Sequence, residues 1–148
     1  MLITLVVAAQ IAQAIALGAA IGLEREMSAQ PAGLRTHMLV ALGAVIVTLA
    51  GAHAVAANPA TLAAPVITGI GFLGGGAILR GDKSVQGMTT AATIWVNAAI
   101  GMAAGIGEFR LAIAATGITL IVLIVLPPIE RYFEERAGIV DVRNHSNR

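Results

Sequence analysis

Residues 61–83 read TLAAPVITGIGFLGGGAILRGDK, an apolar stretch that ends abruptly on basic residues. A helix needs about 20 apolar residues to cross ~30 Å of hydrocarbon. The chain contains five such blocks, which run over Leu2–Leu23, Met38–Val55, Leu62–Leu79, Thr89–Gly107 and Leu111–Leu126. We therefore predict an all-α, polytopic membrane protein with five transmembrane helices.

The basic residues predict how these helices are oriented. Eight of the nine Lys and Arg residues lie at alternate ends of the blocks, namely Arg25, Arg35, Arg80, Lys83, Arg131, Arg136, Arg143 and Arg148, and only Arg110 lies at the other ends. Cytoplasmic connections of membrane proteins carry the excess of Lys and Arg. We expect the N-terminus outside and the C-terminus in the cytoplasm.

Composition supports a membrane protein and argues against several other classes. The 148 residues are 57% hydrophobic but only 3% aromatic and 11% charged, with a formal net charge of +1. Alanine and glycine are common where membrane helices pack closely. Because cysteine is absent, thiol chemistry and thiolate metal sites are excluded. The sequence has no basic patch of the kind that binds nucleic acid. It also has no nucleophile–base constellation and no phosphate loop, so we do not predict an enzyme.

The third block is the most unusual. It contains Pro65 and a glycine series that includes Gly69, Gly71, Gly74 and Gly76. Two interpretations remain open. A helix broken at membrane depth can expose backbone groups to a transported ligand, and a continuous glycine-rich helix can let a neighbouring backbone approach closely. The G-x-G-x-x-G match at residues 69–74 lacks the strand–helix context of a dinucleotide site.

Two further patterns concern the other helices. Thr90, Thr93, Asn97 and Gly101 form one helical stripe in the fourth block, and we expect it to face the bundle interior or a polar cavity. The small-residue pairs Gly18/Gly22, Gly71/Gly75 and Gly101/Gly105 offer more close-packing faces than one chain is expected to use. They predict a homodimer.

Pro127-Pro128 predicts the end of the fifth helix. Residues 129–137 then place apolar and charged side chains on different sides, which is typical of a short amphipathic helix at the membrane surface. We divide the chain into a transmembrane domain over 1–128 and a cytoplasmic amphipathic helix and tail over 129–148.

Polar residues gather at the predicted cytoplasmic ends of the first four helices. The candidate cluster comprises Glu24, Arg25, Glu26, Arg35, Thr36, Arg80, Asp82, Thr89 and Thr90. We expect Arg35 and Arg80 to pair with Glu24 and Asp82. Weak Mg²⁺ association through Glu24, Glu26 and Asp82 is an alternative, because Mg²⁺ takes one or two carboxylates and retains waters; the excess of cations favours a salt-bridge lattice.

Several segments together resemble the MgtC/SapB family: residues 22–26 (GLERE), 32–37 (AGLRTH), 69–74 (GIGFLG), 76–80 (GAILR), 87–95 (GMTTAATIW) and 98–101 (AAIG). The resemblance implies a bacterial inner-membrane protein linked to magnesium limitation, acid tolerance and survival of pathogens in host cells. It also implies regulation through membrane-protein partners, including the F-type ATP synthase.

Many members of that family carry a C-terminal ACT-like domain, and we expect this chain to be a short form without it. Two functions therefore remain open. The first is a regulator that is surrounded by membrane lipids, binds other membrane proteins and needs no cofactor. The second is an oligomeric transporter or channel for Mg²⁺ or protons, with Gly69, Gly71, Gly74, Gly76, Thr93 and Asn97 as packing or pathway residues.

Overall fold

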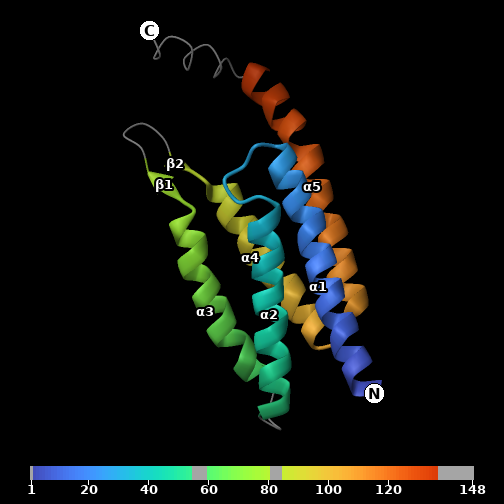
Figure 1. Cartoon of the computed structure of the whole chain (residues 1–148). Coiled ribbons are helices and arrows are strands. Elements are labelled where there is room, and N and C mark those ends of the chain that lie inside the picture. Colours follow the sequence, from blue (N-terminus) through green and yellow to red (C-terminus); the bar gives the residue numbers. More distant parts are fainter. Residues whose placement is uncertain (1, 55–59, 81–84, 137–148) are drawn as a thin grey trace.

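The computed structural model describes residues 2–54, 60–80 and 85–136, and five helices dominate this part of the chain (Figure 1). They are α1 (Leu2–Met27), α2 (Leu34–Ala54), α3 (Ala60–Gly76), α4 (Met88–Gly105) and α5 (Phe109–Arg136). Between α3 and α4, β1 (Leu79–Arg80) and β2 (Val85–Gln86) pair antiparallel, with Leu79 opposite Gln86. The prediction of an all-α architecture is confirmed, apart from this short hairpin.

The helices form an antiparallel bundle in which α1, α2 and α4 make the centre. Helix α5 lies along α1 and α4, and α3 packs mainly on α4 at the opposite edge (Figure 1). The main apolar core lies between the central helices and α5 and includes Ile21, Val45, Ile100 and Leu123. Many other large apolar side chains are exposed on the outside of the bundle, as expected where lipid replaces water.

Three of the helices in the described part are long and apolar enough to cross a membrane: α1, residues 34–52 of α2, and α5. Helix α3 is apolar but short, with 17 residues, which corresponds to about 25 Å. It runs without interruption through Pro65, so the structure shows no break at membrane depth. It also ends three residues before the predicted Leu79. The count of five membrane spans stays a prediction.

Glycines at the centre of the bundle bring the helices into contact. A Cβ on Gly18 or Gly22 of α1 would come within 2.9 or 2.8 Å of α2, and one on Gly105 of α4 would come within 2.8 Å of Thr48. These glycines therefore pack against helices of the same chain. We had predicted that such pairs would be available for a dimer, and these are not.

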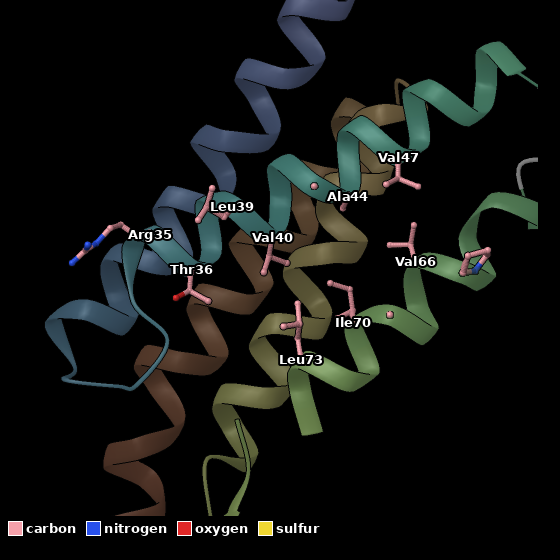
Figure 2. Close-up of a pocket in the computed structure, with 12 residues that line it drawn as sticks. Arg35, Thr36, Leu39, Val40, Ala44, Val47, Val66, Ile70 and Leu73 are labelled. Atoms are coloured by element: carbon pink, nitrogen blue, oxygen red, sulfur yellow. The ribbon is translucent and has the colours of Figure 1, made fainter. Parts of the chain in front are cut away.

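The α3 glycines behave differently. A Cβ on Gly69, Gly71 or Gly76 would meet nothing within 4 Å, and one on Gly74 would make an ordinary contact with Ala91 at 3.6 Å. Gly69, Gly71 and Gly76 therefore bring no other described helix into close contact, and their role as packing or pathway residues stays a prediction. Between α2 and α3 lies an open apolar groove of ≈ 500 Å³ (Figure 2).

The predicted stop at Pro127-Pro128 is also wrong, because α5 continues through both prolines to Arg136. Each proline removes one backbone donor from the helix, and in membrane helices neighbouring groups can compensate for that loss. The residues assigned to a separate amphipathic helix thus extend α5 beyond the other helices (Figure 1). The division of the chain into domains at residue 128 stays a prediction; residues 137–148 lie outside the described part.

The turn after α1 carries a strained residue. Gln30 N–H donates to the Arg25 carbonyl at 2.9 Å and Ala29 N–H to the Glu26 carbonyl at 3.1 Å, which is the Schellman pattern. Ala29 accordingly has φ 53°, a left-handed conformation that costs an L-residue ~1–2 kcal/mol. The same pattern after α4 has Gly107 at φ 84°.

We expect Ala29→Gly to raise the thermal unfolding midpoint of the purified protein by about 2 °C, since relief of the strain exceeds the added chain entropy by ~0.5–1 kcal/mol. Gly107→Ala is the matched reverse change and should lower the midpoint. A thermal scan in one detergent measures both. If the two substitutions shift the midpoint in the same direction, backbone strain at Ala29 is not the cause.

Candidate functional site

Charged residues gather at one end of the bundle, where α1 and α3 end, α2 and α4 begin, and α5 extends past them (Figure 1). We call it the basic end. The sequence predicts this gathering because each connection at this end carries basic residues. Several cavities and a buried polar seam lie near it, and the candidate residues are distributed among them.

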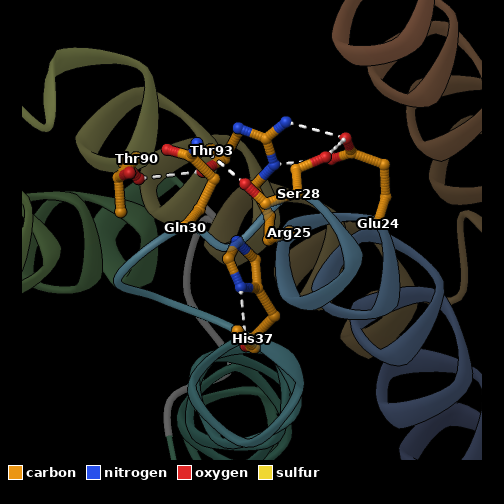
Figure 3. A network of polar contacts seen from close by, with 8 residues as sticks. Glu24, Arg25, Ser28, Gln30, His37, Thr90 and Thr93 are labelled. Atoms are coloured by element: carbon orange, nitrogen blue, oxygen red, sulfur yellow. Dashed lines mark hydrogen bonds and ion pairs between the residues drawn. The ribbon is translucent and has the colours of Figure 1, made fainter.

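Arg25 is the buried cation of the basic end, with 5% of its surface exposed. Its Nε and Nη2 donate to the two carboxylate oxygens of Glu24, the second bond at 2.9 Å (Figure 3). Ser28 Oγ, one helical turn further on, donates to the same carboxylate at 2.8 Å. Glu24 therefore has a bidentate partner and a hydroxyl donor, and its negative charge is compensated locally.

The Arg25 side chain lines a polar cavity of ≈ 460 Å³ between α1, α4 and α5. The polar wall consists of Arg25, Ser28, Gln30, Thr89, Glu130 and Arg131. The candidate cluster named Arg25 and Thr89, but it missed the other four. Ser28 was detectable from its i, i+4 spacing to Glu24, whereas Glu130 and Arg131 were missed because α5 was predicted to end before them. The cavity offers both signs of charge, which suits a zwitterionic group or a charged segment of another protein.

The two acidic residues of α1 have different partners. Glu26 Oε2 accepts the backbone N–H of Leu34 at 3.0 Å, at the start of α2, while Glu24 binds Arg25 and Ser28. Within the described ranges, no group of three His, Cys, Asp or Glu residues is arranged to hold a metal ion. The predicted third ligand, Asp82, lies outside those ranges, so weak Mg²⁺ association stays a prediction.

A polar seam is buried between α2 and α4. Thr93 Oγ1 donates to the Thr90 carbonyl at 2.8 Å, and Asn97 Nδ2 donates to the His37 carbonyl at 2.6 Å. His37 is fully buried, and its Nδ1 lies 3.1 Å from the Gly33 carbonyl. The prediction that Thr90, Thr93, Asn97 and Gly101 face the interior is confirmed. The Asn97 bond joins α4 to α2, whereas the Thr93 bond stays within α4. His37 was missed as a seam residue, because it directly follows Arg35 and Thr36 and was not distinguished from these residues at the helix start.

The seam also contains polar atoms without a protein partner. Among the described residues, His37 Nε2, Thr90 Oγ1 and Asn97 Oδ1 are buried and make no hydrogen bond. Buried polar groups are normally satisfied by protein or ordered water. Figure 3 shows the His37 ring directed toward the Arg25 side of the seam.

Arg35 and Thr36 belong to another part of the basic end. Both line the α2–α3 groove and not the polar cavity (Figure 2). The predicted pairing of Arg35 with Glu24 is wrong, because Arg25 holds that carboxylate. Topology indicates which residues share an end of the bundle, but not which side chains meet there. The predictions for Asp82 and for the Arg80 side chain lie outside the described residues.

The helical bundle, its apolar exterior and its charged end together define a polytopic membrane protein. The MgtC family model matches residues 11–132, and the chain belongs to that family. It is 46% identical over 113 residues to Protein MgtC of Salmonella typhimurium, a match that covers 76% of this chain and 49% of the relative.

Two further relatives extend this comparison. "Putative magnesium transporter YhiD" of Escherichia coli is 44% identical over 119 residues, covering 74% of this chain and 55% of the relative. An uncharacterized Synechocystis protein is 39% identical over 126 residues, covering 83% and 53%. The chain therefore spans about half the length of the curated relatives it matches. No solved structure shows significant similarity to it.

Proposed function

We propose that this protein is a magnesium-linked regulator in the bacterial inner membrane and that it acts through contacts with other membrane proteins. Family membership and the reference to magnesium transport in the name of the Escherichia coli relative support the link to magnesium. One structural observation favours a regulator: the polar cavity at the basic end, where Arg25 is already paired and Arg131 and Glu130 extend from α5. Such a cavity suits a charged segment of a partner better than a bare divalent cation.

We further propose that the basic end faces the cytoplasm, because it carries Arg25, Arg35 and Arg131. The polar cavity would then be accessible to cytoplasmic segments of a partner, and we name the F-type ATP synthase as the first partner to test. A reporter fused after Arg148 should be cytoplasmic and one inserted at Asn58 external. Finding both reporters on the same side would exclude this orientation.

An oligomeric transporter for Mg²⁺ or protons is the second candidate. Two observations favour it: the name of the Escherichia coli relative, and the glycines of α3 that have no neighbour within 4 Å. Gly71 and Gly75 would let a second copy approach α3 closely, which gives the proposed homodimer a contact surface. The mass of the protein in native-like lipid measures this, and a monomer alone would exclude the dimer.

A paired experiment distinguishes the two functions. Purified protein in liposomes that contain a Mg²⁺-sensitive dye should admit no more Mg²⁺ than protein-free liposomes. Capture from native membranes at low Mg²⁺ should recover ATP synthase, and Arg131→Glu should reduce recovery about tenfold, the equivalent of ~1.4 kcal/mol for one charged contact. Arg110→Glu is the matched control, because Arg110 is an exposed arginine at the other end of α5.

Two results would contradict the regulator. Mg²⁺ uptake that rises in proportion to the amount of protein would favour the transporter. If Arg131→Glu and Arg110→Glu reduce the amount of recovered ATP synthase equally, its capture does not depend on the polar cavity.

A further inference from the structure

The groove between α2 and α3 continues toward the basic end. Its apolar walls include Val40, Val66, Ile70 and Leu73. A second cavity, of ≈ 410 Å³, shares Thr36, Val40 and Leu73 with it and reaches Thr90. The two cavities therefore lie side by side along α2 and share part of their walls, and the second brings the polar residues Thr36 and Thr90 to the basic end.

The length of the groove suits a hydrocarbon chain. Its lining on α2 runs from Arg35 to Val47, which corresponds to about 18 Å of helix. That length is comparable to the ~15 Å depth of one leaflet, half of the ~30 Å hydrocarbon core.

The polar end of the groove favours a negatively charged head. Arg35 is exposed there, in the first turn of α2, which contains no acidic residue (Figure 2). The start of a helix attracts anions. Glu26 is the acidic neighbour, and its Oε2 is engaged by the Leu34 N–H at 3.0 Å. The described ion pair at this end is Arg25 with Glu24, which does not include Arg35.

An unpartnered hydroxyl supports a ligand independently of charge. Thr90 is fully buried, lines the second cavity, and its Oγ1 has no hydrogen-bond partner among the described residues. A buried hydroxyl without a partner is costly. An ester carbonyl between a phosphate and a hydrocarbon chain is a suitable acceptor for it.

We propose that this groove is a specific site for an anionic phospholipid. One acyl chain lies between α2 and α3, Arg35 and the Thr36 hydroxyl bind the phosphate, and the Thr90 hydroxyl donates to an ester carbonyl. The site is separate from the polar cavity, and it does not depend on the proposed regulatory function. Gly71 and Gly75 lie on the opposite side of α3 by helical spacing, so a dimer through them leaves the groove open.

Native mass spectrometry of the full chain tests the site, with phosphatidylglycerol and phosphatidylcholine as the added lipids. We expect the wild type to retain phosphatidylglycerol in preference to phosphatidylcholine. Arg35→Gln should weaken phosphatidylglycerol binding about fivefold, the effect of one cation at an anionic membrane surface. Arg110→Gln, at the opposite end of the bundle, should change it little.

Filling the groove tests the acyl-chain half of the proposal. Gly43 and Gly69 line the groove, and a Cβ on either would meet nothing within 4 Å, so Gly43→Leu and Gly69→Leu should place a side chain in the groove. Each should reduce binding of both lipids, while Gly117→Leu, at a glycine on α5 that is equally open around Cβ, should not. If Gly43→Leu does not fold, Gly69→Leu provides the same test.

Three outcomes would overturn the site. They are equal retention of the two lipids by the wild type, equal losses with Arg35→Gln and Arg110→Gln, and a stable dimer that Gly43→Leu dissociates, which would assign the groove to a second copy. Inorganic phosphate should not raise the thermal midpoint. If inorganic phosphate raises the midpoint as strongly as the lipid does, the site binds free phosphate and the acyl chain contributes nothing to binding.

Discussion

Replacing Gly101 with alanine should destabilise the bundle, although alanine is the better helix former. A Cβ at Gly101 would lie 2.6 Å from the Ala41 carbonyl oxygen and 3.0 Å from the Ala44 Cβ. The nearer atom belongs to the backbone, so it cannot rotate away. Helices α2 and α4 would have to separate, and the Asn97–His37 hydrogen bond of 2.6 Å, one turn along the same contact, would be stretched.

The expected effect is the sum of two costs minus one gain. Overpacking a tight contact costs ~1–3 kcal/mol, and more where the backbone must move. Replacing a helical glycine with alanine recovers ~1 kcal/mol of helix propensity, and loss of the buried Asn97 bond adds ~1–3 kcal/mol to the cost. Gly101→Ala should therefore lower the free energy of unfolding by ~2–4 kcal/mol.

Gly117→Ala is the matched control, because Gly117 lies within α5 with nothing within 4 Å. That substitution should raise the free energy of unfolding by up to ~1 kcal/mol. Reversible unfolding in mixed micelles measures both variants. Opposite signs support the close approach of α2 and α4. If Gly101→Ala is also stabilising, these helices do not meet as the structure places them.

Hydropathy predicted the order of the five apolar helices because each apolar block is long enough to be recognised by composition alone, but the additional short helix predicted after Pro128 is part of α5. Their ends were less predictable. Helix α5 continues through Pro127-Pro128 because the loss of backbone donors does not stop a helix that neighbouring groups support. Helix α3 ends at Gly76, where the chain turns into β1. Such boundaries depend on tertiary contacts that the local sequence does not encode.

The candidate site was predictable at the same coarse level. The distribution of charged residues predicted that Arg25, Arg35 and Thr89 lie at one end of the bundle. It could not predict that Glu24 forms its ion pair with Arg25 and not with Arg35. Adjacent residues on a helix do not normally face each other, so the observed pair runs against the spacing rule. The glycine pairs gave a similar result: spacing identified them, but only the packing separates the buried Gly101 from the open Gly71.

Removing Arg25 should be the most damaging single change at the basic end. Arg25 supplies two of the three hydrogen bonds that the Glu24 carboxylate receives, and its side chain is 6% exposed, against 14% for that of Glu24. Arg25→Met would leave a partly buried carboxylate with only Ser28 as a donor. Leaving such an acceptor without its main partner costs ~1–3 kcal/mol. Arg136→Met, in the exposed last turn of α5, removes only a cation–π contact with Tyr132 and should change stability by less than ~1 kcal/mol.

A double-mutant cycle separates the ion pair from simple loss of packing. In Glu24→Met/Arg25→Met no charge is stranded, so the double variant should be more stable than Arg25→Met alone. Arg25→Lys should lie between the wild type and Arg25→Met, since lysine keeps the charge but cannot form the bidentate contact. If the double variant is no more stable than Arg25→Met, the cost comes from the lost arginine stem and not from an uncompensated Glu24, and the buried pair is not what stabilises this end of the bundle.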